Sequence, residues 1–294
     1  MLQQTRAQAV IPYYQRFLER FPGAEALAHA READVLACWS GLGYYSRARN
    51  LQRAARAIVA AGRFPEDYEG IRELPGVGPY TAAAVASIAF GAPHAVLDGN
   101  VLRVISRLRA DGANVRSSKT RARFQKIADQ WLDRGNPGEF NQAIMELGAT
   151  VCLPRAPRCP ACPVAPLCEA RKTGRQSELP VTGNKPAPER ISLQVAIVRK
   201  SGSVLLRQRP ATVSLMAGFW ELPAPQDLPD WRPSADLGSF RHTITHHHYT
   251  ITVLTGKISR ARRDFRWLRG VQLARMPLTT VTRKALRLLT DDIE

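Results

Sequence analysis

The sequence predicts two domains, the first all-helical and the second of mixed α and β structure. Residues 1–170 carry apolar side chains at helical spacing, and short turns rich in glycine and proline separate them. Residues 171–190 are polar and contain three prolines and two glycines, a composition typical of a linker. Residues 191–294 contain several β-type runs and one final helical segment.

The predicted elements follow this division in order. The helical domain contains the segments IPYYQRFLERF, READVLACWSGL, SRARNLQRAARAIVAAG, YTAAAVASIAFG and RARFQKIADQWLDRG. The second domain contains the strand-like runs ISLQVAIVRK, SVLLRQR, YTITVLTGKI and FRWLR, and then the helical run TVTRKALRLL. The opening residues, MLQQTRAQAVIPYYQRF, have apolar positions at helical spacing with no capping residue before them, which predicts a helix already under way at residue 1.

The charge of the chain predicts a polyanionic partner. Forty-two Lys and Arg residues against 25 Asp and Glu residues give a formal net charge of +17. Such a balance is typical of proteins that bind nucleic acid, the alternative being an arginine-rich composition that serves only solubility. No apolar run approaches the roughly 18–20 residues of a membrane span. Residues 1–17 lack the features of a signal peptide, so a cytoplasmic protein without a membrane partner is expected.

Four of the five cysteines lie within 17 residues. Cys152, Cys159, Cys162 and Cys168 form a Cys-x6-Cys-x2-Cys-x5-Cys pattern, while Cys38 stands alone and is expected to be a small buried hydrophobe. An odd count with tight clustering favours metal binding over disulfides. The spacing by itself is compatible with either zinc or an iron–sulfur cluster.

Two short segments suggest further function. In LPGVGPY, Gly76 and Gly78 permit a tight turn just before a helix that starts near Pro79, and such a turn can hold a DNA phosphate. The alternative is an ordinary helix–helix turn. In LDGNVLRVISRL, Asp98 and Asn100 stand where a helix should begin, and the simplest role for Asp98 is a helix cap.

Taken together, these motifs resemble a known family. LPGVG, LDGNV and the four-cysteine run resemble the helix-hairpin-helix DNA glycosylases that carry a [4Fe-4S] cluster. MLQQT, GLGYYSRARNL and FNQAIMELGA make nearly the whole chain similar to the MutY-type adenine DNA glycosylases. The resemblance implies a helix-hairpin-helix glycosylase domain over residues 1–170, a linker over 171–190 and a Nudix-like domain that recognises 8-oxoguanine over 191–294.

The resemblance also implies an activity, a cofactor and a partner. The activity is base excision repair, in which adenine mispaired with 8-oxoguanine or guanine is removed from double-stranded DNA. The cofactor is a [4Fe-4S] cluster rather than zinc, with Cys152, Cys159, Cys162 and Cys168 as its ligands. The protein would be a monomer that associates with DNA in the bacterial nucleoid.

The roles carried over by resemblance at the reacting sugar and base concern three catalytic positions and one that binds adenine. Asp98 would supply the carboxylate at the sugar, with Asn100 beside it, and Gln142 would contact adenine. Tyr80 stands where endonuclease III has a nucleophilic lysine, which Tyr cannot replace in Schiff-base chemistry, so a monofunctional glycosylase is expected. Tyr80 would support the reaction at the sugar, the alternative being helix packing.

Other positions would contact the DNA around the lesion. Where the family has a Phe-Ser-His loop that recognises the oxidised guanine, this chain has Ile244, Thr245 and His246. The Thr keeps the hydroxyl group, whereas Ile changes the apolar contact. The DNA-binding set implied by the resemblance consists of Gln3, Gln4, Thr5, Tyr44, Gly76, Gly78, Gln142, Thr245 and His246.

Departures from the family pattern leave alternatives open. The resemblance places a Glu that protonates adenine upstream of residue 1, and these 294 residues do not contain it. We therefore expect impaired excision by the chain as given, whether its start is misplaced or it is truncated. The alternatives are a lesion-binding protein without catalysis and a redox iron–sulfur protein, and the basic charge and the hairpin argue against the latter.

The second domain is not expected to have its own enzyme activity. APQDLPDWRPSADLG lacks the Glu-rich metal-binding helix of a Nudix hydrolase, so pyrophosphate hydrolysis is not expected. Four of the six histidines lie within residues 242–248. A metal site there is the less favoured interpretation, because the sequence shows no further ligand cluster beside them.

Overall fold

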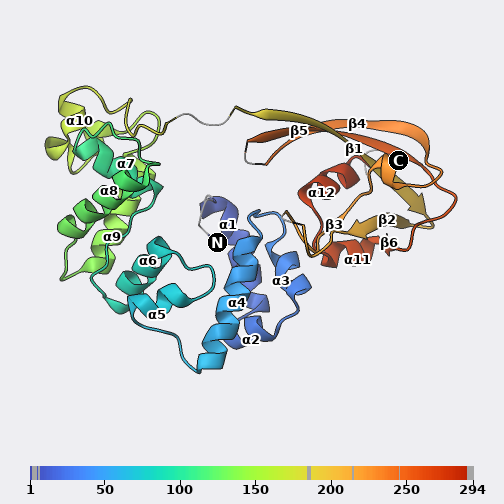
Figure 1. Ribbon diagram of the computed structural model, residues 1–294, viewed down its shortest axis with the longest axis horizontal. Coiled ribbons are helices and arrows are strands. Elements are labelled where there is room, and N and C mark those ends of the chain that lie inside the picture. The colour runs from blue at the N-terminus through green and yellow to red at the C-terminus, as the bar shows by residue number, and fades with distance from the viewer. Residues whose placement is uncertain (2–4, 6, 184–186, 214, 245, 290–294) are drawn as a thin grey trace. The chain divides into compact units, whose positions relative to one another are not determined.

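The computed structural model describes residues 1, 5, 7–183, 187–213, 215–244 and 246–289 (Figure 1). Internal contacts divide the chain into two units: Met1–Val59 together with Pro186–Glu294, and Ala60–Lys185. Each unit has its own hydrophobic clusters. The domain boundaries at residues 170 and 190 stay a prediction. Among the described residues, none of the helices combines the length and hydropathy needed to cross a lipid bilayer.

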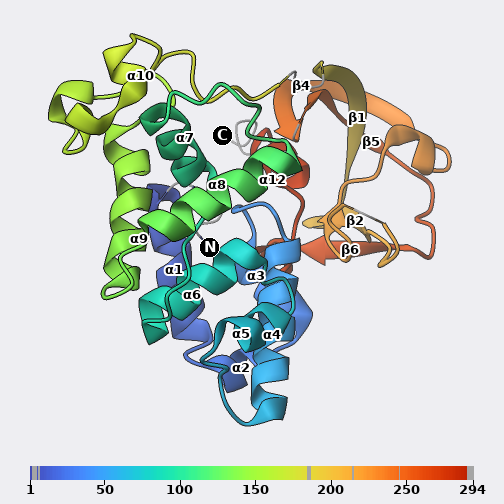
Figure 2. The same ribbon diagram turned by 60° about the vertical axis from the view of Figure 1, so that its left-hand side comes forward.

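The unit Ala60–Lys185 is helical throughout. Its elements are α5 (Tyr68–Glu73), α6 (Pro79–Phe90), α7 (Gly99–Leu108), α8 (Ser118–Trp131), α9 (Pro137–Glu146), the π-helical turn η1 (Leu147–Val151), the 3₁₀ turns η2 (Cys159–Ala161) and η3 (Ala165–Leu167), and α10 (Glu169–Lys172). Figure 2 shows α7, α8 and α9 as neighbours.

Helix α7 is the centre of this unit. It contacts α8, α9, η1 and α10. Val101, Val104 and Ile105 are at most 1% exposed, and they pack with Phe124 of α8, which is fully buried. The apolar residues of α7 lie on one side, but Arg103, Ser106 and Arg107 on the other side are buried as well, so this helix is enclosed by its neighbours instead of lying on the surface.

In the other unit, four helices come first: α1 (Ala7–Arg20), α2 (Ala24–His29), α3 (Glu32–Trp39) and α4 (Ser46–Ala61). Phe17 of α1 meets Trp39 of α3 edge to face, with ring centroids 5.9 Å apart. The helix predicted to be under way at residue 1 begins at Ala7, and Met1 and Thr5 lie outside it. Arg47 donates a hydrogen bond to the carbonyl oxygen of Met1, so this carbonyl is paired with a side chain instead of with a helical amide.

The remainder of this unit is a mixed sheet with short helices. The strands are β1 (Glu189–Lys200), β2 (Ser203–Gln208), β3 (Trp220–Glu221), β4 (Arg232–Ile244), β5 (His247–Lys257) and β6 (Phe265–Arg269), in the order β3-β2-β1-β5-β4, with β6 also paired to β2. Strands β1 and β5 are parallel and the other pairs are antiparallel. The helices are η4 (Pro225–Asp227), α11 (Gly270–Arg275) and α12 (Thr280–Arg287).

The sheet has an apolar cluster on each face, as the two-residue alternation of strands requires. Ile197 and Val253 pack on one face with Ala285 of α12, whereas Ala196 and Val198 pack on the other face. Helical and strand-bearing parts of this unit also share a core. Phe219, fully buried, lies 4.2 Å from Tyr45 between ring centroids, and Arg49 donates to the carbonyl oxygen of Ala217.

Candidate functional site

The glycine turn predicted from LPGVG joins α5 to α6. Gly76 has φ of +79°, a conformation that favours glycine, and the amide of Val77 donates to the carbonyl oxygen of Leu74 at 3.0 Å. Gly78 has an ordinary φ of −92°, and an added Cβ there would meet no atom within 4 Å. The backbone therefore does not require glycine at residue 78. Its missing side chain leaves open space beside the start of α6.

Asp98 is the N-cap of α7, as the simplest sequence interpretation predicted. Its Oδ1 accepts a hydrogen bond from the amide of Val101 at 2.8 Å, and its Oδ2 accepts one from the Asn100 side chain at 3.0 Å. Asp98 and Asn100 are both half-buried. The two bonds fix the orientation of the carboxylate, which remains partly accessible.

Asn100 is held in turn by Arg103. The Arg103 Nη2 donates to Asn100 Oδ1 at 2.9 Å and to the carbonyl oxygen of Gly148 at 2.7 Å, and its Nε donates to the carbonyl oxygen of Cys152 at 2.7 Å. Arg103 is 7% exposed, and burial lowers its pKa. One guanidinium therefore links the cap of α7 to the start of the cysteine-bearing loop. The sequence analysis did not identify this residue.

Two residues of the segment FNQAIMELGA hold neighbouring backbone in place, Gly148 by close packing and Asn141 by hydrogen bonds. A Cβ added at Gly148 would lie 2.6 Å from the Cβ of Asn100, so only glycine fits there. Asn141, 1% exposed, accepts a hydrogen bond from the amide of Val96 at 3.1 Å and donates to Ser87 Oγ at 2.8 Å. Together they fix the chain before and after Asp98. Both could have been suspected only from their place in the resembling segment.

Tyr80 and Gln142 extend from the helices beside this cap. The Tyr80 hydroxyl donates to the Met145 sulfur at 3.3 Å, and the ring is half-buried. Burial, followed by the negative charge of Asp98, raises the pKa of Tyr80, so the phenol is neutral at pH 7. The side chain of Gln142 is exposed and donates to the carbonyl oxygen of Gly138 at 3.2 Å.

The four clustered cysteines line one cavity. The amide of Cys162 donates to the carbonyl oxygen of Cys159 at 3.2 Å, and that of Cys168 to Ala165 at 3.2 Å, so tight turns curl the loop around the cavity. None of the five cysteines forms a disulfide. Burial raises the pKa of Cys162, and the neighbouring cysteines add to this effect. The rest of the lining includes Val104, Leu108, Leu147, Val151 and Pro157.

A buried arginine faces this cavity. Arg107, 1% exposed, donates to the Cys152 sulfur at 3.2 Å and to the carbonyl oxygens of Leu153 at 2.7 Å and Leu179 at 3.0 Å. None of these acceptors carries a charge unless Cys152 is a thiolate. A buried guanidinium favours an anion beside it, so this environment fits thiolate ligands of a metal group.

The lesion-contacting residues expected from the resemblance are only partly described. Gln3, Gln4 and Thr245 lie outside the described residues. Tyr44 is 52% exposed and has φ of +49°, an uncommon backbone conformation for a residue with a side chain. The Arg47 guanidinium lies 5.2 Å from the centre of the Tyr44 ring and donates to Thr5 Oγ1 at 3.2 Å. The structure thus connects Tyr44 to Thr5 through Arg47, which the sequence analysis missed.

His246 stands on the turn between β4 and β5 and is exposed. Its ring lies 4.0 Å from that of His247, between centroids. It belongs to the same unit as Tyr44, whereas Asp98, Tyr80 and the four cysteines belong to the unit Ala60–Lys185.

Both the N-terminal and the C-terminal part of the chain are similar in sequence to known proteins. Residues 1–130 match the family described as HhH-GPD superfamily base excision DNA repair protein, and residues 194–288 match the NUDIX domain. The adenine DNA glycosylase of Mus musculus is 34% identical to this chain, in an alignment that covers 99% of this chain and 70% of the mouse protein.

Solved structures resemble the chain over a shorter span. A thermostable thymine-DNA glycosylase aligns with a TM-score of 0.53 and 29% identity, over 58% of this chain and 80% of the glycosylase. A non-covalent complex of endonuclease III with DNA aligns with a TM-score of 0.51 and 25% identity, over 58% of this chain and 79% of that protein.

Gly148→Ala tests the packing beside Asn100. The added methyl group must displace Asn100 or the η1 turn, so we expect the free energy of unfolding to fall by about 1–3 kcal/mol. Gly112→Ala is the matched control in the same unit, because its Cβ would meet the Arg175 guanidinium at an ordinary 3.5 Å. Denaturant unfolding should show a change within about 0.5 kcal/mol for the control. Equal stability of both variants would contradict the close approach.

Proposed function

This chain belongs to the adenine DNA glycosylases of base excision repair, and we propose that its substrate is adenine mispaired with 8-oxoguanine or guanine in duplex DNA. The membership confirms the predicted family, the helix-hairpin-helix and Nudix-like fold classes, and the enzyme class. The observation that carries the proposed chemistry is the Asp98 carboxylate, oriented by two hydrogen bonds beside the neutral phenol of Tyr80.

Excision breaks the bond between the sugar C1′ and N9 of adenine. The electron pair leaves with the base, which needs a proton, and positive charge develops on the sugar. A fixed carboxylate stabilises that charge, which is the role we propose for Asp98, with Asn100 holding its orientation. Water then adds to C1′ and loses a proton, giving free adenine and an abasic site. The resemblance assigns the proton on adenine to a Glu of the family, and Asp98, Asn100 and Tyr80 do not take its place.

Tyr80 has no amine and cannot form a Schiff base with the sugar. We therefore propose a monofunctional glycosylase that leaves the strand intact. Burial and the Asp98 carboxylate raise the pKa of Tyr80, so its neutral phenol adds no negative charge beside Asp98. The Tyr80 phenol can orient the deoxyribose of the target nucleotide or the Asp98 carboxylate.

The target base must leave the helix stack before it reaches Asp98. Gly76 and Gly78 would hold a backbone phosphate at the start of α6, which the open space at Gly78 supports. Gln142, exposed on α9, would contact the extruded adenine. The net charge of +17 suits phosphate binding. We also propose, from the resemblance alone, that the protein acts as a monomer on DNA of the bacterial nucleoid.

Recognition of the oxidised guanine would fall to the other unit. By resemblance, Gln4 and Tyr44 would wedge into the duplex around the oxidised guanine, with Gln3 and Thr5 flanking the wedge. The exposure and the positive φ of Tyr44 support a role in contact rather than in packing. Thr245 and His246, which follow β4 in the sequence, would contact the oxidised base.

The four cysteines would hold a [4Fe-4S] cluster. The shared cavity and the buried Arg107 beside Cys152 support thiolate ligands there. When bound, the cluster would tie the loop together through iron–thiolate bonds. Arg103 and Arg107 connect this loop to α7, because both donate hydrogen bonds to its backbone carbonyls and both belong to the helix that Asp98 caps.

Asp98→Asn tests the proposed carboxylate. Asn caps helices as well as Asp does, so the fold should persist while the negative charge is lost. We expect single-turnover excision of adenine opposite 8-oxoguanine to fall at least about 100-fold below the already impaired rate of the unchanged chain, with duplex binding retained.

The matched control for this experiment is Asp67→Asn. Asp67 caps α5 in the same way, accepting a hydrogen bond from the amide of Gly70 at 2.8 Å. Its excision rate should equal that of the unchanged chain. An unaffected Asp98→Asn rate, or an equal loss in both variants, would refute the assignment.

Cys162→Ser and Cys38→Ser together test the proposed cluster. Anaerobically purified protein should be brown and contain iron and acid-labile sulfide, and Cys162→Ser should lose much of both because one ligand is gone. Cys38→Ser should keep them, since Cys38 packs with the apolar cluster of helices α1–α4. Colourless unchanged protein with stoichiometric zinc would show that the cluster assignment is wrong.

A further inference from the structure

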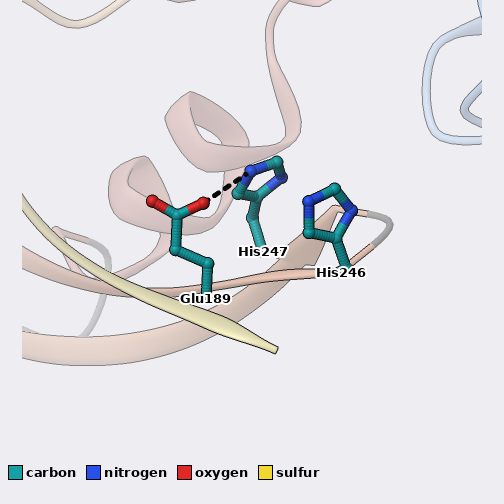
Figure 3. Close-up of side chains that lie close together, drawn as sticks. All are labelled: Glu189, His246 and His247. Carbon is teal, nitrogen blue, oxygen red and sulfur yellow. Dashed lines mark ion pairs between the residues drawn. The ribbon is translucent and has the colours of Figure 1, made fainter. Parts of the chain in front are cut away.

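The histidine run of residues 246–248 meets an acidic residue that lies far from it in sequence. Glu189 begins β1 and His247 begins β5, and these parallel strands place the two residues directly in register. The amide of Glu189 also donates to the carbonyl oxygen of His246 at 3.0 Å. The backbone of all three residues is therefore tied together by the sheet (Figure 3).

The side chains of these residues converge. Glu189 Oε2 lies 3.1 Å from His247 Nε2, and the rings of His246 and His247 lie 4.0 Å apart at a tilt of 36°. One potential ligand atom from each residue lies within 4.8 Å of those of the other two. Figure 3 shows the two imidazoles and the carboxylate on the same side of the strands.

We propose that Glu189, His246 and His247 form a binding site for a zinc-class divalent cation. Tetrahedral zinc with bonds of about 2.0–2.1 Å separates its ligand atoms by about 3.4 Å. The contact between Glu189 and His247 is already close to that separation. His246 has to approach by about 1.5 Å at most, and it is exposed on a turn where its side chain can rotate.

The donor set decides the class of metal. Two imidazoles and one carboxylate suit zinc and similar transition metals, whereas Mg²⁺ and Ca²⁺ prefer sites made of oxygen ligands. Glu189 and His246 are exposed and His247 is half-buried, so a fourth coordination position is open to water or an external ligand. The ion pair by itself adds little stability, because the Glu189 side chain is 61% exposed.

His248 supplies a matched control within the same run. Successive side chains of a strand point to opposite faces, so His248 points away from the face of Glu189 and His247. It is exposed, and its register partners are Thr243 on β4 and Arg190 on β1. A metal site formed by geometry therefore needs His247 but not His248, whereas non-specific binding to a histidine run would need both equally.

Zinc binding to the full chain tests the site, using protein whose cysteine ligands are already occupied by their own metal group. Isothermal titration with Zn²⁺ should give one site per chain that weakens about tenfold or more in Glu189→Gln and in His247→Ala, and stays unchanged in His248→Ala. In ¹⁵N-imidazole NMR, Zn²⁺ should shift the resonances of His246 and His247 together and leave His248 in place.

Two results would overturn the proposal. Zinc affinity that is the same in Glu189→Gln, His247→Ala and the unchanged chain would mean that these residues are only an ion pair. Equal weakening in His248→Ala and His247→Ala would mean non-specific binding to the run. Both readouts measure zinc binding alone, so their outcome does not depend on adenine excision. Glu189→Gln is a conservative change that keeps the strand pairing.

Discussion

The geometry of the helical unit depends on how α7 is attached to the loop that carries the cysteines. Arg103 and Arg107 extend from one helix into backbone carbonyls of that loop, and both are nearly fully buried. The N–H groups of a buried guanidinium need hydrogen-bond acceptors, and leaving a buried donor unpaired costs about 1–3 kcal/mol, more when the group is charged. The loop and the helix therefore hold each other in place, and the Asp98 cap at the start of α7 is held with them through Arg103 and Asn100.

This arrangement connects the two chemical features of the unit. At one end of α7, Asp98 presents a carboxylate whose orientation is set by Val101 and Asn100. Further along the helix, Arg107 donates to the Cys152 sulfur. Gly148 lets the η1 turn approach Asn100 closely enough for Arg103 to bridge the two. Reactive groups supported by a second layer of buried polar contacts keep their orientation without help from the substrate.

Much of this fold could be predicted because its signals are local. The four-cysteine spacing, the Gly76 turn and the Asp98 cap are each encoded within a few residues, and the cap formed as the simplest interpretation expected. Strand β4 was not predicted, since Pro233 and Gly238 interrupt its pattern and its pairing with β5 has register shifts near both. The helix expected from residue 1 also begins later, at Ala7.

The remaining features depend on contacts that no local pattern encodes. Arg103 and Arg107 look like ordinary solvated charges in the sequence, because the loop carbonyls to which they donate lie more than 40 residues away. The proximity of Glu189 to His247 requires the parallel register of β1 and β5. The sequence interpretation set a metal site at the histidines aside for lack of a further ligand, and only the sheet brings Glu189 beside them.

We propose that Arg103 acts on the reaction by holding Asn100 and, through it, Asp98. Arg103→Lys keeps the positive charge but cannot bridge Asn100 and Gly148 at once. In protein that keeps its colour and its thermal midpoint, single-turnover excision of adenine opposite 8-oxoguanine should slow by about 10–100-fold, while the dissociation constant for the duplex stays unchanged. Excision at the full rate in that variant would contradict the account.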